Sequence, residues 1–292
     1  MGAELVESIG HLRQRLTAAR RSNATIGLVP TMGALHAGHV RLIEEARHEC
    51  QAVAVSIFVN PLQFDREDDL RRYPRRLDED LQLCDRFGVD VVFAPSVDDM
   101  YPVPPECTID VGRLADHLCG KYRPGHFRSV ATVVMKLFGI VQPDRAYFGE
   151  KDAQQLAIIR RFVADLNVPV QIVGVPTVRE PDGLAMSSRN RLLSASDREA
   201  AGCVPRALDA AEAAVARGET RAAAIVEAAT GAIAEQPQAR LEYAEARDPN
   251  TLEEVEAVNA PTLLALAVWV GSVRLIDNRV LVPIGSNLGR NP

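Results

Sequence analysis

Apolar and polar residues alternate along the first two thirds of the chain in a repeating strand–helix rhythm. Short, almost wholly apolar runs are separated by longer segments in which apolar residues recur every three or four positions. Such runs are typical of strands buried on both faces, and such segments are typical of covering helices. The expected strands span residues 25–30, 52–60, 89–94, 145–148 and 168–175, and the expected helices span residues 38–50, 77–87, 127–141 and 152–167. We predict a Rossmann-like, doubly wound parallel sheet.

The pattern changes beyond about Pro176. An alanine-rich stretch over residues 196–235 contains little glycine and recurring apolar positions, which predicts helices rather than disorder. Strand-like segments follow at residues 241–247, 262–270 and 273–277. Helices followed by closely spaced strands are typical of a small α+β domain with an antiparallel sheet. We therefore predict two domains, a Rossmann-like domain over residues 1–177 and a smaller α+β domain over residues 178–292.

Composition and charge exclude several function classes. The 292 residues include 33 basic and 39 acidic side chains, and the net charge of −6 disfavours nucleic acid as a partner. The five cysteines are scattered without a C-x-x-C pair, which indicates reduced thiols in a cytoplasmic protein. We expect no signal peptide, because no basic start precedes an apolar core. We also expect no membrane span, because the longest apolar stretch, residues 263–273, is about half the length required.

Two histidines stand directly after the first predicted strand, at the start of a predicted helix. Backbone N–H groups at a helix N-terminus lack partners, and the helix dipole adds roughly half a positive charge there. His36 and His39 are three residues apart and would share one helical face. Such a place favours a phosphate. The alternatives are two ordinary surface histidines, or metal ligands, for which this loop offers no third partner.

Polar residues follow three further strands, at the edge where ligands of a doubly wound sheet bind. We expect four loops to converge on one crevice. Their polar segments are residues 31–39, residues 60–63, residues 149–152, and residues 178–179 with 186–189.

Each of these groups also has a purely structural interpretation. Asn60 followed by proline would end a strand, and Asp152 would cap a helix. Residues 187–190 would form a flexible linker. The acids at positions 78–80 would be favoured by the helix dipole alone, and we keep that interpretation ahead of metal binding. Arg123 is either an anion clamp or a loop charge.

Several well-known catalytic and nucleotide-binding motifs are absent from the sequence, which reduces the number of reactions that the site could catalyse. The chain contains no G-x-x-x-x-G-K-[ST], G-x-G-x-x-G, G-x-S-x-G or H-E-x-x-H motif. What fits is attack on the α-phosphate of a nucleotide with pyrophosphate leaving, because that chemistry needs cationic and dipolar donors. The candidate donors are His36, His39, Lys151, Ser187, Ser188 and Arg189.

The residues at these positions resemble a known family. His-Ala-Gly-His and Met-Ser-Ser-Arg are similar to the H-I-G-H and K-M-S-K-S pair of the nucleotidyltransferase superfamily. More specifically, blocks at residues 29–36, 56–64, 73–75, 148–152, 185–190, 241–243 and 274–278 resemble the pantoate–β-alanine ligase family. Arg189 stands where the superfamily pattern often has lysine, and Ala185 replaces its first lysine. Phosphate charge would therefore come largely from Lys151 and Arg189.

The resemblance implies a two-step ligation that uses ATP and Mg²⁺ in a homodimer. It also implies that residues 1–177 form the catalytic domain and that residues 178–292 form a lid domain. Pantoate would attack the α-phosphate of ATP to give a pantoyl adenylate, and β-alanine would then release AMP. The implied ATP contacts are His36, His39, Lys151, Ser187, Ser188 and Arg189, with Gly149 and Asp152 at the ribose and Val178 and Met186 flanking adenine. The implied pantoate contacts are Gln63, Gln155, Asn60 and the Met32 backbone N–H; His36, His39, Lys151 and Met32 would be catalytic, and Asp80 would contact the metal.

Two other function classes compete with this one. An aminoacyl-tRNA synthetase fragment would need an anticodon-binding extension and a basic face, which a chain of this length and charge does not offer. A nucleotidyltransferase acting on a phosphate ester is a related alternative. A nucleotide-binding module without activity is disfavoured, because both phosphate-binding segments are intact.

Overall fold

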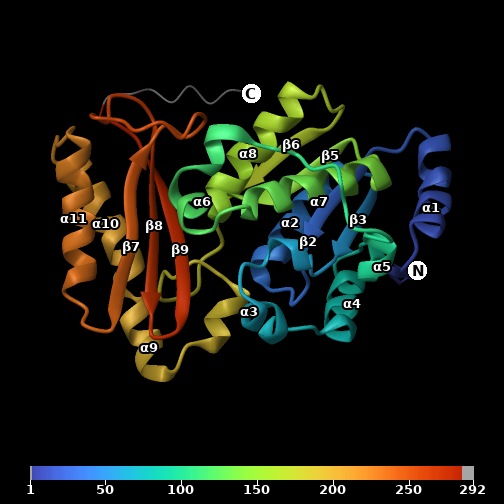
Figure 1. Cartoon of the computed structure of the whole chain (residues 1–292), viewed down its shortest axis with the longest axis horizontal. Helices are drawn as coiled ribbons and strands as arrows, with labels where there is room; N and C mark the ends of the chain where they lie inside the picture. The colour runs from blue at the N-terminus through green and yellow to red at the C-terminus, as the bar shows by residue number, and fades with distance from the viewer. Residues whose placement is uncertain (1, 285–292) are drawn as a thin grey trace. The chain divides into compact units, whose positions relative to one another are not determined.

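A computed structural model describes residues 2–284 of the chain, which form two compact units (Figure 1). The first unit contains the residues up to Glu150 together with Ile158–Val178. The second contains Lys151–Ala157 together with the residues from Arg179 onward. Each unit is built around its own sheet.

The first unit contains a six-stranded parallel sheet in the order β1-β4-β3-β2-β5-β6. The strands are β1 (Glu4–Val6), β2 (Ile26–Thr31), β3 (Ala52–Ile57), β4 (Val91–Phe93), β5 (Arg145–Gly149) and β6 (Gln171–Val175). The chain winds outward from β2 through β3 and β4, and then returns to place β5 on the other side of β2. The strand order therefore reverses between β2 and β5, the point where such sheets bind ligands at the carboxyl ends of their strands.

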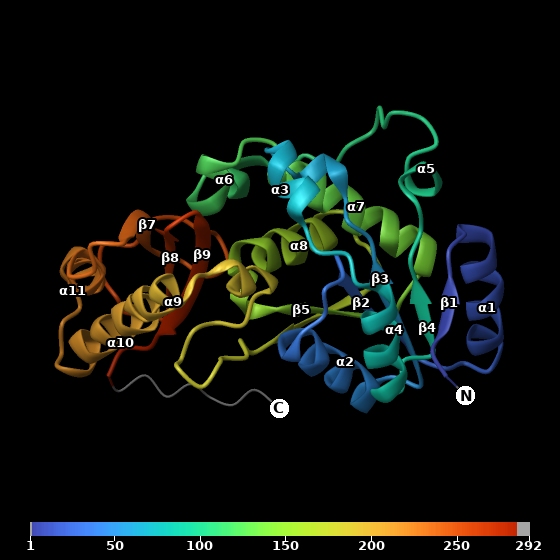
Figure 2. The same cartoon turned by 90° about the horizontal axis from the view of Figure 1, so that it is seen from below.

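Helices cover both faces of this sheet, and Figure 2 shows α2 and α7 on opposite faces. The α-helices are α1 (Ile9–Arg21), α2 (Ala37–Glu49), α3 (Glu67–Arg72), α4 (Leu77–Arg86), α5 (Val97–Met100), α6 (Leu118–Tyr122), α7 (His126–Val141) and α8 (Ala153–Asp165). Single 3₁₀ turns occur at η1 (Pro61–Gln63), η2 (Gly112–Ala115) and η3 (Glu150–Asp152). Ile43 of α2 packs in one buried cluster with Val29, Val55 and Val92 from three central strands, which explains why those strands are almost wholly apolar.

The second unit contains an antiparallel sheet in the order β7-β8-β9, packed against α10 and α11 (Figure 1). Its elements are η4 (Ser188–Leu192), α9 (Ala195–Ala201), α10 (Cys203–Ala216), α11 (Ala222–Ala234), β7 (Ala239–Arg247), β8 (Thr262–Val270) and β9 (Val273–Leu281). Ala207, Ala211 and Ala214 form a buried stripe along α10, where small side chains allow close packing. A two-residue turn joins β8 to β9, and Gly271 takes the positive φ of 55° that it requires.

The predicted fold class is confirmed in both parts of the chain. The sequence pattern did not reveal β1 and α1, and η4 replaces part of the loop expected over residues 178–190. The assignment of catalysis to residues 1–177 and of a lid to residues 178–292 stays a prediction. No helix among the described residues combines the length and apolar character needed to cross a membrane. No disulfide joins the five cysteines, all of which lie in the described part.

Candidate active site

A buried carboxylate shapes the loop between β2 and α2. Asp80 lies in the first turn of α4 and is 3% exposed. Its Oδ2 accepts a hydrogen bond from the Ala34 N–H at 2.9 Å, and its Oδ1 accepts one from the Leu35 N–H at 2.7 Å. Gly33 has a φ of 80°, and a Cβ there would lie 3.0 Å from both Asp80 Oδ2 and Ile57 Cγ2. Both oxygens of the Asp80 carboxylate therefore accept hydrogen bonds from the backbone. Contact between Asp80 and a metal stays a prediction.

His36 and His39 form a reciprocal cap at the start of α2. His36 is the N-cap residue, and its Nδ1 accepts a hydrogen bond from the Gly38 N–H at 3.1 Å. His39 Nδ1 accepts one from the His36 N–H at 3.3 Å, which completes a capping box. A backbone N–H only donates, so both Nδ1 atoms are acceptors and each neutral ring carries its proton on Nε2. The two ring centroids are 4.1 Å apart.

Asn60 and Gln63 belong to one hydrogen-bond chain in the first unit. Asn60 is 1% exposed, and its Oδ1 accepts from the Leu62 N–H at 3.3 Å and from the Tyr101 hydroxyl at 3.1 Å. Its Nδ2 donates to Gln63 Oε1 at 3.1 Å, and Gln63 Nε2 donates to the Met32 sulfur at 3.0 Å. The Leu62 N–H fixes the orientation of the Asn60 amide, and Asn60 in turn orients Gln63.

Tyr101 also belongs to this chain of hydrogen bonds, and the sequence did not predict its part in it. Burial raises the pKa of its hydroxyl to about 12, so it donates to Asn60 at neutral pH. It precedes an irregular, proline-containing stretch and belongs to no motif, so no local signal marked it.

Arg123 has intramolecular partners on the segment that follows β3. Its guanidinium pairs with Asp65 at 2.9 Å and donates to the Gln63 carbonyl at 3.0 Å. His126 Nδ1 donates to the same carbonyl at 2.9 Å. Burial raises the pKa of Asp65, but the charge and hydrogen bonds of Arg123, together with a backbone hydrogen bond and the nearby His126, jointly lower this pKa below its usual value. These contacts show that Arg123 holds the backbone of Gln63, while a role as an anion clamp stays a prediction.

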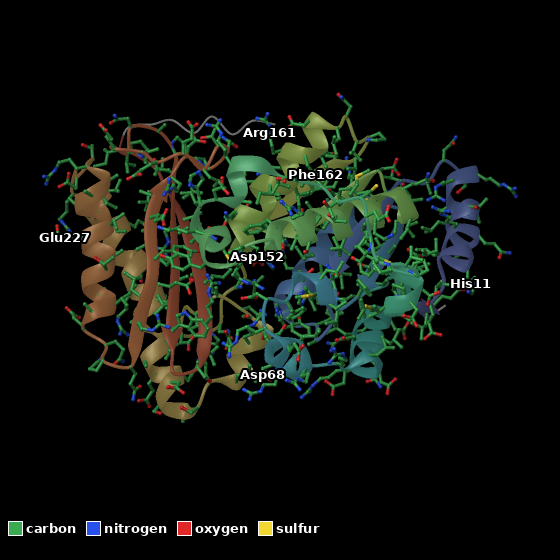
Figure 3. The ribbon with its side chains drawn as sticks, viewed as in Figure 1. His11, Asp68, Asp152, Arg161, Phe162 and Glu227 are labelled. Carbon is green, nitrogen blue, oxygen red and sulfur yellow. The ribbon has the colours of Figure 1, made fainter. Side chains whose placement is uncertain are left out.

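The segment after β5 belongs partly to the second unit. Gly149 is the last residue of β5, and Lys151 and Asp152 lie in η3, directly before α8. Asp152, labelled in Figure 3, is exposed, whereas Lys151 and Gln155 are half-buried. The Lys151 ammonium forms no ion pair with another residue of the described part, so its charge is not neutralised there.

The segment with Ser187, Ser188 and Arg189 contains the 3₁₀ turn η4 where a linker without regular structure was the alternative. Ser187 is the N-cap residue of η4, and its Oγ accepts a hydrogen bond from the Arg189 N–H at 3.3 Å. Asn190, in the middle of η4, is 8% exposed and donates to the Ala185 carbonyl at 3.0 Å. The candidate adenine neighbours, Val178 in the first unit and Met186 in the second, are both half-buried.

The described residues supply hydrogen-bond donors and cations, and they contain no group of three or more His, Cys, Asp or Glu side chains that could hold a metal ion. Two imidazoles with protons on Nε2, one lysine and a 3₁₀ turn led by two serines are suited to stabilising phosphate oxygens. His36 and His39 are poorly suited to act as bases through Nδ1, because each Nδ1 already accepts a backbone hydrogen bond.

Comparison with known proteins gives a consistent result along the chain. The family model described as pantoate-beta-alanine ligase matches residues 4–280. A pantothenate synthetase from Sinorhizobium medicae is 54% identical over 279 residues, which cover 95% of this chain and 96% of the relative. One from Geobacter sulfurreducens is 51% identical over 277 residues, with 95% and 98% covered.

Solved structures agree with the sequence relatives. A crystal structure of pantothenate synthetase from Thermus thermophilus matches with a TM-score of 0.91 and 45% identity over 96% of this chain and 100% of that one. A pantoate-beta-alanine ligase from Francisella tularensis, described as complexed with beta-gamma ATP and beta-alanine, matches with a TM-score of 0.77 and 35% identity over 96% and 98%. The family model and the relatives each cover nearly the whole chain, so this protein belongs to the pantoate–β-alanine ligase family.

Proposed function

We propose that the enzyme joins pantoate to β-alanine in two steps at the expense of ATP. In the first step a pantoate carboxylate oxygen bonds to the α-phosphorus of ATP, and the bond to the bridging oxygen breaks to release pyrophosphate. In the second step the β-alanine amine bonds to the activated carbonyl carbon, and AMP leaves with the oxygen that joined the two. The amine loses a proton, and the product is the amide pantothenate.

The observation that carries this proposal is the reciprocal cap at the start of α2. It fixes the tautomers of His36 and His39, so each neutral ring offers an Nε2–H donor and no basic nitrogen. Donors of this kind stabilise charge that builds up on phosphate oxygens as pyrophosphate leaves. Pantoate needs no base in this step, because its carboxylate is already ionised at neutral pH.

In this proposal, residues of the second unit stabilise the remaining negative charge of the phosphates. Lys151 supplies an ammonium, while Ser187, Ser188 and Arg189 supply hydroxyls, a backbone N–H and a guanidinium. The like charges of a carboxylate and a triphosphate repel, so these cations matter most as the two groups approach. In the same proposal Gly149 and Asp152 bind the ribose, and Val178 and Met186 flank the adenine.

Gln63 is suited to bind an oxygen of pantoate. Its Oε1 accepts a hydrogen bond from Asn60, so Nε2 remains the donor, and among the described residues 2–284 that donor meets only the Met32 thioether sulfur. Sulfur is a weak acceptor, so exchanging it for a hydroxyl or carboxylate oxygen of pantoate is favourable. Asn60, the Met32 N–H and Gln155 complete the proposed pantoate contacts.

Mg²⁺ enters this proposal with the nucleotide. Mg²⁺ is usually held by substrate phosphates with one or two carboxylates and several waters rather than by a dedicated protein cage. The described residues offer no such cage, and both Asp80 oxygens accept backbone hydrogen bonds. No step is therefore assigned to a protein-bound metal.

Isotope exchange between ATP and pyrophosphate tests the proposal. We expect exchange only when pantoate is present, and AMP only when ATP, pantoate and β-alanine are all present. Exchange that requires an amino acid instead would support a synthetase. No exchange with any acid would support a binding module.

We further propose a cytoplasmic location and a homodimer. The lack of disulfides among the five cysteines supports the reducing compartment. Sedimentation of the full chain at several concentrations tests the dimer, and a mass that stays at one chain would contradict it.

A further inference from the structure

The last strand of the second unit carries a carboxylate at a position that should be apolar. Along β9, Val273, Leu275, Asp277 and Leu281 are buried on one face, while the residues between them are more exposed. Asp277 is 2% exposed and thus occupies a core position of the strand. Burying a carboxylate costs free energy unless the charge is paired and hydrogen-bonded, so Asp277 requires such a partner.

That partner is Arg179, in the segment that leads to Ser187. The two terminal nitrogens of the guanidinium donate hydrogen bonds to Asp277, Nη1 to Oδ2 at 2.7 Å and Nη2 to Oδ1 at 3.1 Å. Nη1 also donates to the Gly183 carbonyl at 3.0 Å. The Arg179 backbone pairs with Ala185 in an antiparallel bridge, and the Ala185 carbonyl accepts from Asn190 at 3.0 Å. A continuous set of contacts therefore runs from Asp277 to η4, the turn with the two serines.

The next residue of β9 holds the other phosphate-binding segment of this unit. Asn278 Nδ2 donates to the Lys151 carbonyl at 2.8 Å, although the two residues are 127 positions apart. Because a carbonyl only accepts, this contact fixes the orientation of the Asn278 amide. Asp277 Oδ1 also accepts from the Asn278 N–H at 2.8 Å, which orders the strand between the two contacts.

We propose that Asp277 and Asn278 are positioning residues that set the spacing between Lys151 and the segment of residues 187–189. Neighbouring residues of a strand point to opposite faces, so one rigid strand holds both segments, through Arg179 on one side and the Lys151 backbone on the other. This inference rests on the proposed function, in which both segments act on ATP phosphates. The two side chains act through other residues and are not themselves catalytic.

Substitution of Asn278 tests the contact with Lys151. We expect Asn278→Ala to lower the kcat of pantoate-dependent ATP–pyrophosphate exchange by about 10- to 100-fold, the scale of a displacement near 1 Å, with KM for pantoate little changed. Arg279→Ala is the matched control, because the next side chain of β9 pairs with Asp209 instead, and its kcat should equal that of the wild type.

A double-mutant cycle separates positioning from general stability. If Asn278 acts through Lys151, adding Asn278→Ala to Lys151→Ala should lower kcat no further. Multiplying defects, or an unchanged kcat in Asn278→Ala alone, would overturn the role of Asn278.

The Asp277 contact needs a variant that folds. Asp277→Leu alone would leave Arg179 without its partner and is expected to destabilise the protein strongly. The double variant Asp277→Leu with Arg179→Met replaces the buried pair by apolar groups, which is often neutral for stability. We expect its melting temperature to stay near that of the wild type while its exchange kcat remains at least about 10-fold lower. Recovery of kcat together with stability would show a purely structural pair and overturn the proposal.

The wild-type enzyme distinguishes failure of this inference from failure of the proposed function. If the wild type shows no pantoate-dependent exchange, the proposed function is wrong and the inference falls with it. If the wild type exchanges and the variants match it, only the inference is wrong.

Discussion

Two substitutions of His36 separate its structural role from its chemical role. Asparagine places Oδ1 close to the position of the imidazole Nδ1, so His36→Asn keeps an acceptor for the Gly38 N–H and removes the Nε2–H. His36→Ala removes both. His39 Nδ1 accepts from the backbone of residue 36, so that half of the capping box survives in either variant.

The contacts of His36 give the expected size of each effect. Loss of an N-cap acceptor costs about 1 kcal/mol, and asparagine is among the preferred N-cap residues. His36→Ala should therefore melt about 2–4 °C below the wild type, and His36→Asn should melt with it. Both variants lack the donor to the leaving pyrophosphate, so both should lower the kcat of adenylate formation by about 10²- to 10³-fold.

Scanning calorimetry and pantoate-dependent ATP–pyrophosphate exchange are the two assays. Wild-type kcat in His36→Asn would refute the role of Nε2–H as a phosphate donor. A melting temperature of His36→Ala equal to that of the wild type would refute the role of the ring in capping. A large loss of stability in both variants would show that the ring packs in a way the cap does not explain.

Three further substitutions test the other parts of the site. Lys151→Ala should lower the kcat of exchange by about 10²-fold or more with the fold intact, whereas Lys121→Ala on the surface should not; equal kcat in both would exclude Lys151 from phosphate binding. Gln63→Ala should chiefly raise KM for pantoate, and a defect confined to KM for ATP would overturn its placement. Asp80→Ala removes the acceptor of two buried N–H groups, so it should lower the free energy of unfolding, measured in urea, by about 2–6 kcal/mol. The exposed Asp78→Ala should lower this free energy by less than about 1 kcal/mol. Similar losses from both aspartates would contradict the loop-holding role of Asp80.

The sheet could be predicted because its central strands are buried on both faces and show this as apolar runs. The run at residues 52–60 predicted one strand, yet β3 ends at Ile57 and Asn60 caps η1. Pro61 ends the pattern there, because proline suits the first position of a helical turn and cannot donate to a strand ladder. Strand β1 was missed because three residues are too few to show a period, and α1 because it buries only Leu12 and Leu16.

The candidate site was predictable only where its residues are close in sequence. His36 and His39, three positions apart, indicated a helix start, and the structure places them at the start of α2. Tyr101 reaches Asn60 across 41 positions, and Asp80 reaches Ala34 across 46. Contacts of this range depend on how the strands are ordered in the sheet, which local patterns do not encode.

The transfer of oxygen from pantoate to AMP would be direct evidence for a pantoyl adenylate. The enzyme would be given ATP, β-alanine and pantoate that carries ¹⁸O in both carboxylate oxygens, and the products would be analysed by mass spectrometry. The adenylate mechanism predicts one ¹⁸O in AMP and one in the amide carbonyl of pantothenate, because the oxygen that bonds to the α-phosphorus leaves with AMP. Unlabelled AMP, or label in a released phosphate, would contradict it.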